Sequence, residues 1–160
     1  MTSVLKVDNI QNSSGTDAIS IDSNGVIAQP TLQHWSGYHD AVEVPGVDGT
    51  IANWTVTESN GITESSGVWT IPKAGLYFVS TSLLNSVAET GVYWNLNSTR
   101  QWRISYATPP SGGYAMQSGS LIHQFSAGDT LKFTSQTATA SFYGTTLPNA
   151  VGEMCIYKIG

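Results

Sequence analysis

The sequence has few charged residues and few cations, and this shortage argues against one class of partner. Only 11% of its 160 residues are charged, and the formal net charge at pH 7 is -5. The cations are scattered along the chain at Lys6, Lys73, Arg100, Arg103, Lys132 and Lys158. Because a nucleic-acid site gathers cations on one surface to neutralise phosphates, we expect no nucleic-acid partner.

Cysteines and long apolar runs are also scarce. The single cysteine, Cys155, lies in the apolar run "MCIYKI", so no intrachain disulfide can form and the thiol is expected to be a small buried hydrophobe. No window approaches the roughly 20 apolar residues of a membrane span, and the opening "MTSVLKVDNIQNSSG" has no apolar segment typical of a signal peptide. We expect a protein made in the cytoplasm, with no membrane partner.

Motifs specific to catalysis or to a bound cofactor are missing. The sequence contains no Gly-x-Ser-x-Gly elbow, phosphate loop or dinucleotide fingerprint. His34, His39 and Asp40 are the only local group of possible metal ligands, and their spacing matches no common metal motif. Carboxylates can be paired on paper, without the signature of a glycoside hydrolase. We therefore predict no enzymatic activity, no metal and no cofactor.

Short runs of β-branched and aromatic residues, separated by Gly, Pro, Asn or Ser, dominate the sequence after residue 31. The expected strands are 54–56, 68–71, 76–83, 92–96, 102–106, 120–125, 130–133, 140–143 and 154–159. They are too many for one open sheet, and no stretch has a persuasive helical periodicity. In "GVWTIPKAGLYFVS", Pro72 ends one strand and Gly75 turns the chain into the next. The fold class predicted is all-β, a sandwich or jelly roll.

Residues 1–30 differ from the rest because they contain no aromatic residue. Alternating apolar and polar residues at 5–8 and 19–22 surround the polar turn "NSSGTD", which predicts a short β-hairpin. Such a hairpin is marginal alone in water, so it must pair with the main domain, with copies of itself or with a larger assembly. Pro30 marks the expected boundary between residues 1–30 and a domain at 31–160.

Four segments in order resemble the globular head of complement 1q, a member of the tumour-necrosis-factor-like jelly rolls. They are "SGVWTIPKAGLYFVSTSL", "VYWNLN", "SGSLIHQFSAGDTLKF" and "GEMCIYKI". The resemblance covers residues 32–160 and implies a jelly-roll head that assembles as a homotrimer. No collagen-like stalk precedes the head, so a complement-type role is not implied.

The N-terminal segment has a second resemblance. "LKVDNIQNSSGTDAISIDSNGVI" is similar to a segment that precedes varied C-terminal domains in small structural proteins of marine bacteriophages. A segment shared among different heads implies attachment to the virion, through its apolar residues. These residues are Leu5, Val7, Ile10, Ile19 and Ile21.

Three segments, read as exposed loops, are the candidates for ligand contact: "HWSGYHD", "TRQWR" and "TPPSGGY". They combine aromatic rings with polar groups, as shallow carbohydrate sites do, although core packing is the alternative for each tryptophan. His123 is expected on the outer surface of a strand. The candidate ligand-binding residues are His34, Trp35, Tyr38, His39, Arg100, Trp102, Arg103 and Tyr114.

Together these features predict a non-enzymatic virion surface protein, a decoration knob or short fibre made in the host cytoplasm. Its partners are its own copies in a homotrimer, other virion proteins of the capsid or tail, and a glycan on the host surface. A tail fibre that binds a receptor and a capsid cement protein are the alternatives.

Overall fold

The computed structural model describes residues 9–11, 13–14, 17–21, 23–25, 27–28, 32–86, 89–144 and 152–160, all of them strands, turns or irregular segments. Contacts divide the chain into two units, residues 1–32 and 33–160, close to the boundary expected at Pro30. Each unit is described by itself.

The N-terminal unit contains a small antiparallel sheet in the order β1-β2-β3. These strands are β1 (Asn9–Gln11), β2 (Asp17–Ile21) and β3 (Ile27–Ala28). Asn9 pairs with Ser20 across the predicted "NSSGTD" turn, so a hairpin forms there. The expected strand at 5–8, with Leu5 and Val7, lies outside the described residues.

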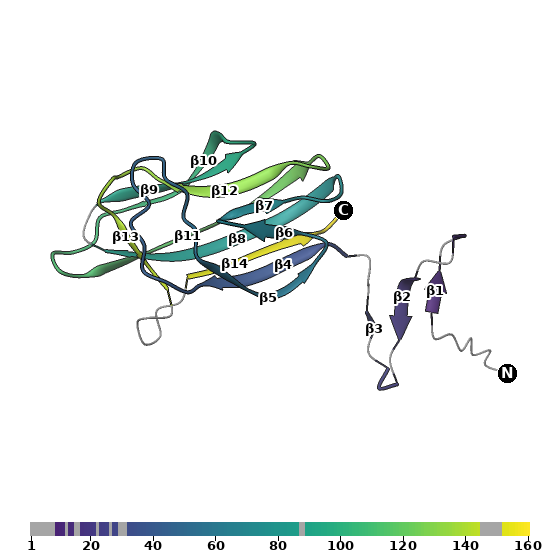
Figure 1. Ribbon diagram of the computed structural model, residues 1–160. Helices are drawn as coiled ribbons and strands as arrows, with labels where there is room; N and C mark the ends of the chain where they lie inside the picture. Colours follow the sequence, from purple (N-terminus) through teal and green to yellow (C-terminus); the bar gives the residue numbers. More distant parts are fainter. Residues whose placement is uncertain are drawn as a thin grey trace. The chain divides into compact units, whose positions relative to one another are not determined.

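The larger unit is a sandwich of two antiparallel sheets (Figure 1). The five-stranded sheet has the order β10-β9-β12-β7-β6, with β6 (Thr63–Ser65), β7 (Val68–Thr70), β9 (Thr90–Leu96), β10 (Thr99–Ala107) and β12 (Thr130–Ser135). The six-stranded sheet has the order β11-β8-β14-β4-β5, with β4 (His34–His39), β5 (Trp54–Asn60), β8 (Gly75–Ser86), β11 (Tyr114–Phe125), β14 (Gly152–Lys158) and, paired to β8, β13 (Ser141–Tyr143).

Aromatic side chains from both sheets fill the space between the layers. Alternate residues of β8, including Tyr77, Val79 and Leu83, are buried, as expected for a strand with one face on a core. Trp69 and Phe133 lie with ring centroids 5.3 Å apart. Around this pair pack the rings of Trp35, Trp54 and Trp94. The core explanation for these four tryptophans is therefore confirmed.

The Pro72 to Gly75 break carries the chain from one sheet to the other. Trp69 and Ile71 are both buried before the break, and Gly75 begins the twelve-residue strand β8 in the opposite sheet. The interruption of the two apolar runs thus marks the crossing between the layers of the sandwich.

The nine strands expected in the head are all present, with longer bounds for several of them. The prediction that "HWSGYHD" forms a loop is wrong, because His34–His39 is β4, between β14 and β5. Gly37 is a strand residue, and the Trp35 indole and the Thr55 carbonyl lie so close to it that a Cβ would clash with both. β6 was also missed, since its Thr-Glu-Ser sequence has no apolar residue.

Candidate functional site

The candidate residues of β4 are divided between the core and the surface. Trp35 is 1% exposed and His39 is 0% exposed, so both belong to the core and neither can contact a ligand. His39 Nε2 lies 2.7 Å from Glu43 Oε1, and its ring packs against Trp54. His34 and Tyr38 alternate with these residues and lie on the outward face of the six-stranded sheet.

The candidate residues of "TRQWR" lie in a strand, which corrects the expectation of a loop. In β10, register shifts fall between Arg100 and Trp102 and between Arg103 and Ser105. Trp102 is half-buried against the core and lies 4.9 Å, between ring centroids, from His123. His123 also packs on the buried ring of Phe125, so it belongs to the inward face of β11 and not to the outer surface as expected.

Tyr114 begins β11 and is exposed on the six-stranded sheet. The eight candidate residues are therefore distributed over the core and two opposite faces of the sandwich, and they do not form one site.

A shallow groove runs across the middle of the six-stranded sheet. It has a volume of about 480 Å³, and small hydroxyl side chains line it, with Ser36, Ser80, Ser82 and Ser118 contributed by three different strands. Glu153 and Cys155 of β14 also line the groove. Burial raises the pKa of the Cys155 thiol, so the thiol is a weak nucleophile near neutral pH.

Exposed apolar side chains lie beside this groove on β11, the edge strand of the same sheet. Met116 and Ile122 are exposed, and Ile122 is 63% exposed. Tyr114, at the start of the strand, packs edge-on against Tyr143. The groove with its apolar edge, formed by Tyr114, Met116 and Ile122, is named here the apolar face.

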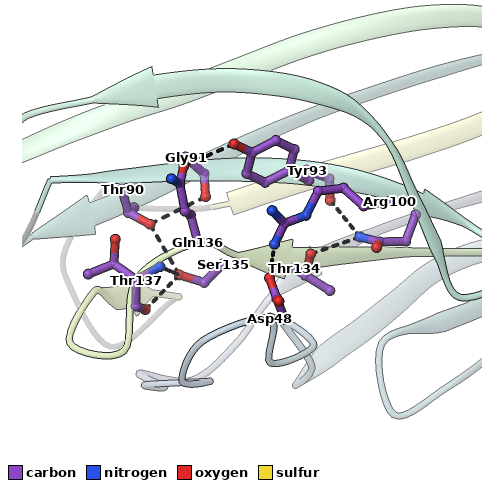
Figure 2. Close-up of polar contacts among 10 residues, drawn as sticks. Asp48, Thr90, Gly91, Tyr93, Arg100, Thr134, Ser135, Gln136 and Thr137 are labelled. Atoms are coloured by element: carbon purple, nitrogen blue, oxygen red, sulfur yellow. Dashed lines mark hydrogen bonds and ion pairs between the residues drawn. The ribbon is translucent and has the colours of Figure 1, made fainter.

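The opposite sheet carries a polar and aromatic cluster (Figure 2). The Arg100 guanidinium lies 4.1 Å from the centre of the Tyr93 ring and forms an ion pair with Asp48. The Tyr93 hydroxyl donates a hydrogen bond of 2.9 Å to Gln136 Oε1. Arg103 lies 5.6 Å from the centre of the Tyr106 ring. We name the four side chains Tyr93, Arg100, Arg103 and Tyr106 the arginine–tyrosine row.

Hydrogen bonds at one end of β12 hold the backbone beneath the arginine–tyrosine row in place. The backbone amide of Gln136 donates a hydrogen bond of 2.9 Å to the Gly91 carbonyl, which connects the end of β12 to β9 (Figure 2). Below it, the Ser135 hydroxyl lies 3.2 Å from the Thr90 hydroxyl and donates to the Thr137 carbonyl. The backbone under Tyr93 and Gln136 is therefore held by both main-chain and side-chain contacts.

Sequence reasoning found the two arginines but missed Tyr93, Tyr106 and Gln136. Tyr93 lies in the expected strand 92–96, and only its alternation with Val92 and Trp94 signals that it faces outward. Tyr106 joins the arginines because of the register shifts in β10, which leave no mark in the sequence pattern.

The described part of the chain contains no group of three or more histidine, cysteine or acidic side chains able to hold a metal ion. Among these same residues, no helix has the length and hydrophobicity needed to cross a membrane. Asp129, in the turn before β12, accepts a hydrogen bond of 2.7 Å from the backbone amide of Ser126.

Comparison with known proteins identifies the architecture. No protein-family model and no curated protein matches the sequence. Among solved structures, murine APRIL at pH 5.0 aligns with a TM-score of 0.64 and 12% identity, over 81% of this chain and 100% of that one. The globular domain of zebrafish complement 1qA aligns with a TM-score of 0.63 and 9% identity, over 80% and 98% of the two chains.

A third structure, Eiger TNF from S. frugiperda, aligns with a TM-score of 0.60 and 15% identity, over 81% of this chain and 92% of that one. Identities this low establish a shared fold only. The larger unit of this chain therefore has the jelly-roll fold of the tumour-necrosis-factor-like and complement 1q domains.

Proposed function

We propose that this chain is a non-enzymatic surface protein of a bacteriophage virion. Residues 1–30 attach it to the particle, and the jelly-roll head projects as a homotrimeric knob or short fibre. The head contacts glycans on the host surface.

The division of the chain into two units carries this proposal. The N-terminal unit has its own three-stranded sheet, and the head closes its core within residues 33–160. A three-stranded sheet is stable alone only when it has a hydrophobic face, and strands of three, five and two residues offer little of one, so we expect this sheet to bind a partner surface. A small unit that needs a partner, joined to a head with a closed core of its own, is the arrangement expected of a tethered projection.

The apolar face supports assembly of the head. Met116 and Ile122 expose large apolar side chains on an edge strand, beside a groove with small side chains that leaves room for a neighbouring surface. Closed symmetry in oligomers commonly covers large apolar side chains that a single copy would expose. A trimer also has three copies of any ligand site, which raises weak glycan binding through effective concentration.

Immunogold labelling of purified phage particles with antibodies against the head tests the proposal. Gold on the surface of intact particles is the expected result, together with slower adsorption to host cells when antibody fragments cover the head. Particles without gold, with the protein recovered only in the soluble lysate, would contradict attachment to the virion. Labelled particles that adsorb normally but lose heat resistance on removal of the protein would contradict the adhesive role and favour the capsid cement alternative.

A further inference from the structure

We propose that the arginine–tyrosine row on the five-stranded sheet binds an acidic oligosaccharide with one carboxylate per sugar. The Arg103 guanidinium binds the carboxylate of a uronate residue. The pyranose ring of the same uronate stacks on the Tyr106 ring. This inference rests on the proposed glycan adhesion and names the class of glycan.

The two register shifts of β10 create the row. Arg100, Arg103 and Tyr106 are each three residues apart, a spacing that in a regular strand would send Arg103 to the opposite face from its neighbours. The shifts instead bring them opposite Asn95, Tyr93 and Gly91 of β9 in turn. Arg100, Arg103 and Tyr106 are exposed, whereas Trp102 and Ile104 between them pack against the core, so these three residues of the row face outward. Bulges commonly re-aim side chains in this way at functional sites.

The row is cationic on a chain that is acidic overall. The net charge is -5, yet both arginines of the sequence lie here, and Lys132 of β12 pairs in register with Asn95 beside Arg100. Asp48 engages Arg100 in an ion pair. Among the described residues, no carboxylate forms an ion pair with Arg103, so its planar fork of donors can bind a carboxylate in a bidentate manner.

The rings beside Arg103 are held in place before any ligand binds. A Cβ on Gly91 would lie 2.7 Å from Gln136 Oε1, 3.2 Å from the Tyr93 ring and 3.4 Å from the Tyr106 ring, so glycine is what lets all three side chains pack together. Tyr93 is further fixed by Gln136 and Arg100. Tyr106 still has 50% of its surface exposed, which leaves its ring available to a sugar. Fixed groups lose little entropy on binding.

The acidic residues around the row favour a ligand of low charge density. Asp48 flanks the row at Arg100 and Glu89 flanks it at Tyr106. These carboxylates repel a ligand with several charges per repeating unit, such as a sulfated oligosaccharide, more strongly than a chain with one carboxylate per sugar. The row lies on the five-stranded sheet and the apolar face on the six-stranded sheet. Assembly through the apolar face therefore leaves the row accessible to a ligand.

Surface plasmon resonance of the full chain over immobilised polygalacturonate, with methyl-esterified polygalacturonate as the neutral reference, tests the inference. We expect binding to the acid form that weakens with added salt, and little binding to the ester. Arg103→Gln should lower the apparent affinity at least about tenfold, since it removes the charged hydrogen bonds to the carboxylate. Tyr106→Ser should also weaken binding. Lys73→Gln removes an exposed cation outside the row and should leave binding unchanged.

Equal binding to the acid and ester surfaces would overturn the inference in favour of a neutral glycan. An equal loss with Lys73→Gln would overturn it in favour of unspecific charge attraction, and absence of binding would overturn it directly. Circular dichroism of each variant, whose altered side chain is exposed, verifies folding. This test can fail without contradicting the proposed function. If the particles carry gold label but the head does not bind polygalacturonate, only the choice of glycan is refuted.

Discussion

Individual core tryptophans differ in what their indole nitrogen contacts. Trp54 Nε1 donates a hydrogen bond of 3.0 Å to the Ile51 carbonyl, whereas Trp69 Nε1 is buried with no hydrogen-bond partner in the described structure. An unpaired buried donor costs free energy, which the packing of the Trp69 ring against Trp35, Trp54 and Phe133 offsets.

Replacing these two tryptophans by phenylalanine should separate the hydrogen bond from the packing. Both changes remove similar apolar volume, but Trp54→Phe also leaves the Ile51 carbonyl without its donor. We expect Trp54→Phe to reduce the free energy of unfolding by about 1 kcal/mol more than Trp69→Phe does. Urea unfolding of both variants measures the difference, and an equal or larger loss for Trp69→Phe would show that packing alone governs the site.

The thiol of Cys155 should react slowly in the folded protein. Burial raises the pKa of Cys155, so at pH 8 its thiolate fraction is smaller than in the unfolded chain. The unfolded state loses this proton at lower pH than the folded state, and the contribution of Cys155 to stability therefore falls as the pH rises through the folded pKa. Labelling with a chromophoric disulfide at pH 8, with and without urea, should show slower reaction when folded. Equal rates would contradict the raised pKa.

At the scale of the element, the β9–β10 hairpin links two of the quoted sequence segments. Asn97 ends "VYWNLN" and, with Ser98, forms the turn between β9 and β10, in which both residues have positive φ. Its side chain donates to Asp129 Oδ1 at 2.8 Å and accepts from the Thr130 amide at 2.9 Å. Two turns that are distant in sequence are thus bound to each other at one end of the five-stranded sheet.

Substitution of Asn97 should separate turn conformation from this link. Asn97→Gly keeps a residue that tolerates positive φ and loses the side-chain hydrogen bonds, so it should cost about 1 kcal/mol. Asn97→Ala also adopts an unfavourable φ and should cost about 1 kcal/mol more than Asn97→Gly. Thermal or urea unfolding of the two variants measures this order, and an Asn97→Ala variant as stable as Asn97→Gly would mean that the turn changes its backbone.

The sequence predicts a strand correctly where the residues that indicate it lie within that strand's own segment. The expected head strands carry runs of β-branched and aromatic residues between turn residues, and these signals lie within each segment. β4 was misread because Gly37 and two histidines are typical of loops, while its alternation of buried and outward residues depends on neighbouring strands. The arginine–tyrosine row depends on pairing between β9 and β10, so a single segment could supply only its arginines.

At the scale of the whole molecule, the two faces of the sandwich have different chemistry. The apolar face on the six-stranded sheet exposes Met116 and Ile122, and the five-stranded sheet presents arginines and tyrosines. This separation allows one face to be covered by copies of the chain while the other remains in contact with solvent.

Charge placed on the apolar face should therefore break the proposed trimer without unfolding the head. Ile122→Glu puts a carboxylate where a neighbouring copy would bury it unpaired, and that burial is costly, whereas in a monomer the exposed side chain remains hydrated. Thr63→Glu adds the same charge to an exposed position of β6 on the opposite sheet and is the matched control.

Light scattering on a sizing column, with circular dichroism to verify folding, measures the outcome. We expect a trimer for the full chain, for residues 33–160 and for Thr63→Glu, and a folded monomer for Ile122→Glu. A trimer that survives Ile122→Glu would move the interface away from the apolar face. A monomeric head with a trimeric full chain would assign assembly to the N-terminal unit, because the head then lacks sufficient contact area of its own to offset the entropy of association.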